Sequence, residues 1–423
     1  MASAIILMLW QKSDGGPPAR EVDTLLMNNS RAPAATRKQI VALIDRAGRK
    51  SWSARIGRLR DEAAASPRYG RLVVLRHAAE FAAEKVVRDL PLSPADQVLA
   101  GRVAALQFLA AGLGKSGQER FDAALAAALA TDGTLIPLLH LHDTAERHRA
   151  MGFEVEFAGL EDATTYDLLA TREDTAVEIV CDTLSAEAGR LVHRAAWMQL
   201  MDRIDPDLQT WLSAHPGRYL LKMTLPRGLR VVEPDGTTTL AELHRRINEM
   251  LTGAKRSDQD EAAVLRLDPL MLAAAQANEN GLMNRLRHEF GPEANLAVTG
   301  DGQGVFVLAA RAGSENEVAV AMRHRLAALA PARLTGARPG ILAMFIEDTD
   351  RLEWRLLREQ LTLEGEARQF LTFPEARPVV AVTCTSRIEL CAEDRALSDP
   401  IGSDVVLYHI DKSSIFIRSD DSI

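Results

Sequence analysis

The sequence contains few cysteines and no long apolar run. Its 423 residues include three cysteines, Cys181, Cys384 and Cys391, and this odd, sparse set excludes a disulfide framework and is typical of a reducing compartment. The apolar stretch at residues 4–10 has neither a basic segment before it nor a small-residue cleavage site after it, which argues against a secretory signal. No apolar run is long enough to span a bilayer. We therefore expect a cytoplasmic protein without membrane association.

Aromatic residues are also scarce, at 5%, and the chain has neither an internal repeat nor sustained heptads. The lack of an internal repeat excludes a solenoid, and the lack of heptads excludes a coiled coil. Hydrophobic residues make up 47% of the chain and charged residues 26%. This is the composition of a globular protein, and a chain of this length can form a core that needs no metal or disulfide. At about 100–200 residues per domain, the length predicts two or three domains.

Basic residues are concentrated near the start of the chain. The net charge is −8, yet residues 31–76 hold twelve Lys and Arg against three acids. This pattern indicates a polyanionic partner, DNA or RNA, because basic side chains with an interleaved aromatic ring can hold a phosphate backbone. The alternative is a solvated helix face. The candidate nucleic-acid contacts here are Arg49, Lys50, Trp52, Arg55 and Arg58.

The hydrophobic pattern predicts a mixed α+β protein. Helical spacing dominates from residue 37 to 151, where Ser93-Pro94-Ala95-Asp96 is a helix start signal. After Gly152 the period becomes 2, which predicts strands at 153–157, 166–170 and 176–181, followed by a helix at 185–204 that Asp205-Pro206 ends. Further strands are expected at 218–225, 305–308, 341–346, 379–384 and 405–410. The expected division is a tail (1–36), a helical region (37–133), a central α/β core (134–254), a polar linker (255–262) and a C-terminal α/β region (262–423).

Two acids on neighbouring predicted strands form the main candidate site. Asp167 lies on the second strand of the central core and Glu178 lies inside the third. Carboxylates from adjacent strands can converge on one Mg²⁺ or Mn²⁺ ion, which activates water and stabilises the leaving oxygen of a phosphodiester. The sequence therefore predicts a divalent-metal site at Asp167 and Glu178.

The order of elements over residues 134–225, with these two acids, resembles the PD-(D/E)XK nuclease-like superfamily. The resemblance implies a restriction-endonuclease-like α-β-β-β-α-β core, and a lysine two residues after the acid of the third strand. Val180 occupies that position, so the resemblance implies a degenerate site in which Lys222, on the next predicted strand, supplies the catalytic cation. Arg190 and Gln199, on the following helix, would then line the cleft and contact nucleic acid.

Two functions are consistent with these features. The first is a Mg²⁺- or Mn²⁺-dependent nuclease with Asp167, Glu178 and Lys222 as catalytic residues. The second is a non-catalytic scaffold that binds a protein partner through a degenerate nuclease-like fold, and Val180 favours this alternative.

Two other groups of polar residues deserve an interpretation. Glu347-Asp348-Thr349-Asp350 follows an apolar strand, where it could hold a cation or begin a helix; the helix cap is favoured. His140, His142, Asp143 and His148 have a metal-like composition. His140 and His142 are two residues apart, however, which places them on different faces of a helix.

Overall fold

The computed structural model describes residues 31–130, 133–231, 239–270, 286–287, 289–291, 294–300 and 304–391. Most of the expected tail and the strand expected at 405–410 lie outside these residues.

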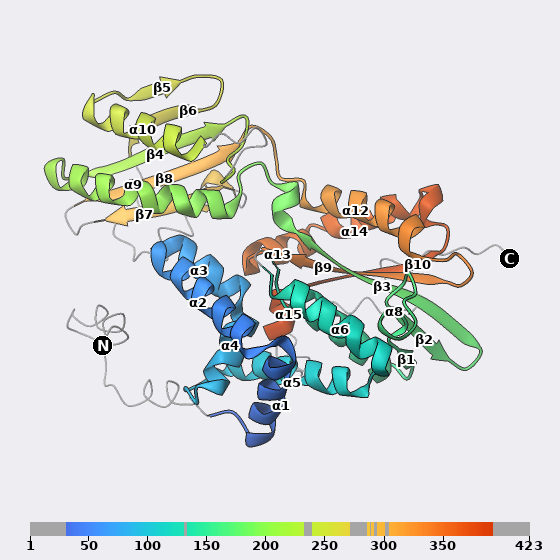
Figure 1. The fold of residues 1–423 in the computed structure, drawn as a ribbon. Helices are drawn as coiled ribbons and strands as arrows, with labels where there is room; N and C mark the ends of the chain where they lie inside the picture. Colours follow the sequence, from blue (N-terminus) through green and yellow to red (C-terminus); the bar gives the residue numbers. More distant parts are fainter. Residues whose placement is uncertain are drawn as a thin grey trace, which may run out of the picture.

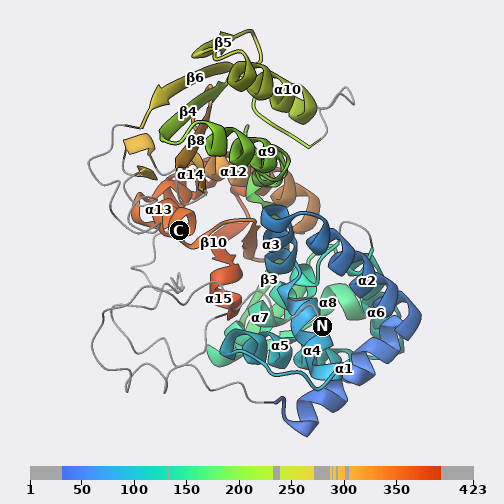
Figure 2. The ribbon, with the colours of Figure 1, turned by 90° about the vertical axis from the view of Figure 1, so that its left-hand side faces the viewer.

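Helices build the N-terminal region, as the sequence predicts (Figures 1 and 2). Ser93 begins the fifth helix with a capping box: its hydroxyl accepts from the Asp96 amide at 3.1 Å, and the Asp96 carboxylate accepts from the Ser93 amide at 2.9 Å. The helices of this region are α1 (Ala34–Ala47), α2 (Arg49–Ala65), α3 (Pro67–Arg76), α4 (Ala78–Val87), α5 (Pro94–Gly112), α6 (Lys115–Ala128) and α7 (Ile136–Ala150).

The first sheet has the strand order β1-β2-β3-β9-β10. Strands β1, β2 and β3 form an antiparallel meander, whereas β3, β9 and β10 run parallel to one another. Parallel neighbours need a long crossover, and here the whole second sheet lies between β3 and β9 in the chain. The strands are β1 (Glu154–Glu156), β2 (Leu168–Arg172), β3 (Thr175–Ser185), β9 (Gly340–Glu347) and β10 (Val379–Ser386).

Different helices cover the two faces of this sheet (Figure 1). Because side chains alternate along β3, Ile179 packs in the cluster formed with α5, α6 and α7, and Val180 packs in the cluster on the opposite face. That opposite face is covered mainly by α12 (Val318–Arg333) and α14 (Thr362–Leu371). The shorter elements of this part of the chain are α8 (Ala158–Glu161), η1 (Ala186–Gly189), α13 (Arg351–Glu359), η2 (Pro374–Ala376) and α15 (Arg387–Cys391).

The second sheet has the order β5-β6-β4-β8-β7, with only β4 and β8 parallel. Helices α9 (Arg194–Ala214) and α10 (Thr239–Thr252) pack on one face through Trp197, Leu200 and Ile247. Leu286 packs on the other face, beside Leu220. The strands are β4 (Arg218–Leu225), β5 (Ser257–Gln259), β6 (Val264–Pro269), β7 (Asn295–Gly300) and β8 (Val305–Ala312).

The mixed α+β class is confirmed, but one expected strand pairing is wrong. The strand at 218–225 pairs with β6 and β8 in the second sheet, and β9 takes the place next to β3. The expected core consists of a helix, three antiparallel strands, a second helix and a strand parallel to the third. In the structure α12 and β9 take the places of the second helix and of the last strand. The central core expected at 134–254 contributes to both sheets, and the expected linker at 255–262 contains β5.

Helix α9 also departs from expectation at both ends. Residues 186–189 form a 3-10 turn, and the helix starts only at Arg194. It then continues through Pro206, although a proline removes one helical hydrogen bond. Leu200 and Ile204 before the proline and Leu208 and Leu212 after it are all buried against the second sheet. This shared apolar face holds the two halves in one helix.

No helix in the described parts of the chain combines the length and the apolar character needed to cross a membrane.

Candidate functional site

Asp167 lies just before β2 and is held by two neighbours. Its Oδ2 accepts from the Cys181 amide at 2.8 Å, and its Oδ1 accepts from Nη2 of Arg333, at the end of α12, at 2.8 Å. Burial raises the pKa of Asp167, and the Arg333 guanidinium opposes that rise. The carboxylate therefore ties the sheet edge to α12.

Glu178 is fully buried and faces the loop between α12 and β9. The Thr335 amide donates to Oε2 at 2.9 Å, and the Thr335 hydroxyl donates to Oε1. The Arg338 guanidinium lies 3.9 Å from Oε1. A buried carboxylate needs such partners, and these satisfy it without a metal ion.

The strand register places the two acids diagonally across β2 and β3, on the same face of the sheet. Leu168 pairs with Ile179, so Val180 lies opposite Asp167, and Glu178 lies opposite Leu169. Val180 is 1% exposed and packs against α12. The next residue on that face, Asp182, forms an ion pair with Arg325. Val180, at the position where the resemblance implies a lysine, is therefore an apolar residue that packs on α12 beside Asp167.

Lys222 lies in the other sheet. Its side chain is 45% exposed, its Nζ lies 3.5 Å from the Asp268 carboxylate, and it sits 5.8 Å from the centre of the Phe290 ring. The expected trio of Asp167, Glu178 and Lys222 is not brought together, because β4 does not neighbour β3. Nor does the described part of the chain contain three His, Cys, Asp or Glu side chains grouped as metal ligands.

Two of the predicted nucleic-acid contacts are core residues. Trp52 is 3% exposed, and its Nε1 donates to Glu84 at 3.1 Å. Arg55 is 1% exposed, and its guanidinium donates to the carbonyl oxygens of Ala130 and Gly133. Neither can touch a phosphate backbone without unfolding α2. Arg49, Lys50 and Arg58 remain on the exposed side of the helix.

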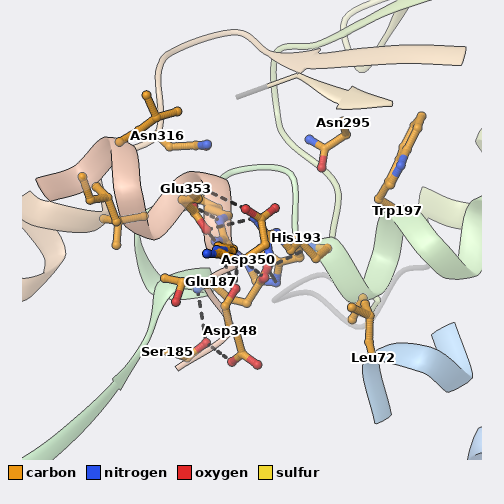
Figure 3. A pocket seen from close by; sticks show the side chains of 18 of the residues that line it. Leu72, Ser185, Glu187, His193, Trp197, Asn295, Asn316, Asp348, Asp350 and Glu353 are labelled. Atoms are coloured by element: carbon orange, nitrogen blue, oxygen red, sulfur yellow. Dashed lines mark hydrogen bonds and ion pairs between the residues drawn. The ribbon is translucent and has the colours of Figure 1, made fainter. Parts of the chain in front are cut away.

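Arg190 lines a large cleft in a different place from that expected, and Gln199 is outside the set of residues that line this cleft. The cleft has a volume of about 1760 Å³ and lies at the carboxyl ends of β3 and β9, where α3, α9, β7 and the starts of α12 and α13 meet (Figure 3). In α/β sheets this edge is the usual place for ligands. Gln199 lies on α9 beside Tyr69 of α3, with which it shares a hydrogen bond.

A buried ion cluster forms one wall of this cleft (Figure 3). Arg190, 4% exposed, donates to Glu187 at 2.5 Å, to both oxygens of Glu353 and to the Asp348 carbonyl oxygen. Arg194 donates to Asp350 at 2.8 Å and to Glu353 at 2.9 Å. Burial alone would lower the pKa of Arg190, but the charges of Glu353 and Glu187 raise it. Arg190 therefore braces η1 against α13, and its guanidinium is not available to nucleic acid.

No protein-family model matches the sequence, and comparisons with the curated proteins and with the solved structures give no match.

The segment at residues 348–350 supplies two acids, Asp348 and Asp350, to the cleft. Asp350 is the N-cap of α13, as predicted, and accepts from the Glu353 amide at 2.8 Å. Asp348 has a φ of 60°, and its Oδ2 accepts from the Ser185 hydroxyl at 2.6 Å. No ion pair within the described residues involves the Asp348 carboxylate. Asp350 therefore caps α13, while the Asp348 carboxylate can still bind a ligand.

Glu347 precedes Asp348 and turns to the opposite face of the sheet. It is 8% exposed, and its Oε2 has no hydrogen-bond partner among the described residues. Burial, with the nearby Asp348 and Glu80 charges, raises the pKa of Glu347 to about 7, against the opposing influence of Arg76 and Arg387. This carboxyl group thus titrates near neutral pH.

Two of the histidines that looked metal-like, His140 and His148, are hydrogen-bonded within the fold. His140 Nε2 lies 2.9 Å from the Ala343 carbonyl oxygen, and burial lowers the pKa of this imidazole to about 4. His148 Nδ1 lies 2.8 Å from the Thr144 carbonyl oxygen. They serve to pack α7 on the sheet.

Proposed function

We propose that this chain is a non-catalytic binding protein. Its first sheet, with α7 and α12, serves as the scaffold, and the cleft at the carboxyl edge of that sheet receives a protein partner. The observation that carries this proposal is the state of Asp167 and Glu178: each carboxylate is already bonded to α12 or to the loop that follows it. The element order supports a nuclease-like ancestry for this sheet, and Val180 supports the loss of its chemistry.

The charge of the cleft favours a protein over DNA or RNA. Eight carboxylates and six arginines line it, and two of these arginines, Arg190 and Arg194, are held by acids. Binding to a phosphate backbone depends on an excess of available cations. The cleft instead has more carboxylates than arginines.

The scaffold role of Glu178 predicts that Glu178→Gln lowers the free energy of unfolding by about 1–3 kcal/mol, because a buried acceptor pair loses one of its two hydrogen bonds. Urea unfolding followed by circular dichroism measures this change. The matched control is Glu173→Gln, in the exposed loop between β2 and β3, which we expect to leave stability within about 0.5 kcal/mol. A vacant metal site would behave differently, since removing an unneutralised buried charge stabilises the protein.

Calorimetric titration with Mn²⁺ and Mg²⁺, beside cleavage assays on single- and double-stranded DNA and RNA, tests the proposal directly. We expect neither saturable metal binding nor cleavage by the parent or by an Asp167→Asn, Glu178→Gln double variant. Metal binding and cleavage by the parent that both disappear in the double variant would overturn the proposal in favour of a metal-dependent nuclease.

A further inference from the structure

The cleft has the size of a peptide site. Pockets for small molecules occupy about 300–1000 Å³, and this cleft has about 1760 Å³. We propose that it binds a peptide segment of a partner protein through a lysine or arginine side chain at Asp348 and Asp350, with an apolar residue beside that side chain. This inference rests on the proposed binding function and names the chemistry of the partner.

The ion cluster in the cleft is rich in acids. Arg190 and Arg194 form ion pairs with the carboxylates of Glu187, Asp350 and Glu353, and Arg190 also donates to the Asp348 carbonyl oxygen. Asp348 makes no ion pair among the described residues, and its Oδ2 accepts only a neutral hydroxyl. Arg190, Arg194 and the nearby Arg287 balance the three carboxylates of Glu187, Asp350 and Glu353, so the Asp348 carboxylate is the charge that an incoming cation would balance.

A second, independent observation points to a peptide. Trp197 lines the cleft on the α9 side and is 1% exposed, yet no acceptor among the described residues receives its indole N–H. Its ring stands near Asn295, whose amide points across the cleft toward Asn316 (Figure 3). A buried donor without an acceptor is rare in proteins. A main-chain carbonyl group of a bound peptide would supply an acceptor for the indole.

The rim supplies the apolar part of the site. Leu75 on α3 is 57% exposed and Leu361, between α13 and α14, is 54% exposed, and both line the cleft. Large exposed apolar side chains at the edge of a pocket are typical of protein-binding surfaces. A leucine or isoleucine next to the basic residue would cover them.

The test uses arrays of heptapeptides with Lys, Arg, Gln or Glu at the centre and randomised flanks, probed with the full chain. We expect at least tenfold stronger binding to the Lys and Arg series than to the Glu series, with enrichment of apolar flanking residues. Asp348→Asn should weaken that binding by about tenfold, because the variant loses the negative charge that strengthens a hydrogen bond from a lysine or arginine. Asparagine tolerates the left-handed backbone at this position, so the variant keeps the fold.

Two control variants separate this inference from the proposed function. Asp174→Asn removes the same charge from the exposed loop at the other end of β3 and should leave binding unchanged. Leu75→Gln alters the rim and should weaken every bound peptide. If peptides bind and Leu75→Gln weakens them without a preference for Lys or Arg, the inference fails and the binding function stands.

If no series binds, or if binding survives both Asp348→Asn and Leu75→Gln, both proposals fail. Spermidine serves as a competitor in solution. If spermidine displaces the peptides at a concentration equal to theirs, the site binds a small amine as well as it binds a peptide. That result would also overturn the peptide inference.

Discussion

Replacing Arg190 with methionine is expected to lower the free energy of unfolding by about 3–5 kcal/mol, because the change leaves buried carboxylates without their cation. Arg190 is 4% exposed and holds Glu187, Glu353 and the Asp348 carbonyl oxygen at once. Methionine fills much of the space but neutralises none of these groups. Equilibrium unfolding in urea, followed by tryptophan fluorescence, measures the loss.

Arg245 provides the matched control. It also bonds two glutamates, Glu242 and Glu249, but its side chain is 55% exposed on α10. Exposed ion pairs contribute about 0–1 kcal/mol, so Arg245→Met should change stability by no more than that. If the two variants lost equal stability, burial would not be what makes the Arg190 cluster important.

A second substitution distinguishes lost charge balance from lost packing. Adding Glu353→Gln to Arg190→Met removes one of the stranded carboxylates, and we expect part of the lost stability to return. A double variant less stable than Arg190→Met alone would show instead that the packing of the arginine stem dominates.

Local sequence patterns predicted the individual elements well. The capping signal at Ser93, the period of 2 after Gly152 and the apolar run at 341–346 all correspond to observed elements. The information for each lies within about ten residues, as helix caps and strand alternation require.

The pairing of strands could not be predicted in the same way. Both β4 and β9 are apolar strands that follow a helix, and nothing in either segment states which one lies beside β3. The choice depends on contacts between residues more than 150 positions apart, such as Glu178 with Thr335. The misplaced Lys222 follows directly from this error.

One error in the candidate site was avoidable. Trp52, Ile56 and Leu59 recur at the spacing of one helix face, which predicts burial of that face and of the neighbouring Arg55. The cleft itself was not predictable, since its walls come from segments far apart in the chain, from α2 to α15. Only the acids at 347–350 gave a local signal.

Glu347→Gln should stabilise the protein at pH 8 and have little effect at pH 5. Below its ordinary pKa of 4.5, glutamate is protonated in both the folded and the unfolded chain, and it adds no penalty. Because burial raises the pKa of Glu347 to about 7 in the folded protein, stability is lost as the pH rises from 4.5 through 7. The full difference corresponds to about 3 kcal/mol, which the neutral glutamine does not incur.

Urea unfolding of the parent and of Glu347→Gln at pH 5, 6, 7 and 8 measures this difference. The gap in unfolding free energy should open between pH 5 and pH 7 and then stay constant, with a glutamine advantage of about 1–3 kcal/mol. Glu261→Gln, at a site 86% exposed, should show no such trend. A constant gap at every pH would mean that Glu347 is ionised throughout and that Arg76 and Arg387, the two cations near it, outweigh its burial.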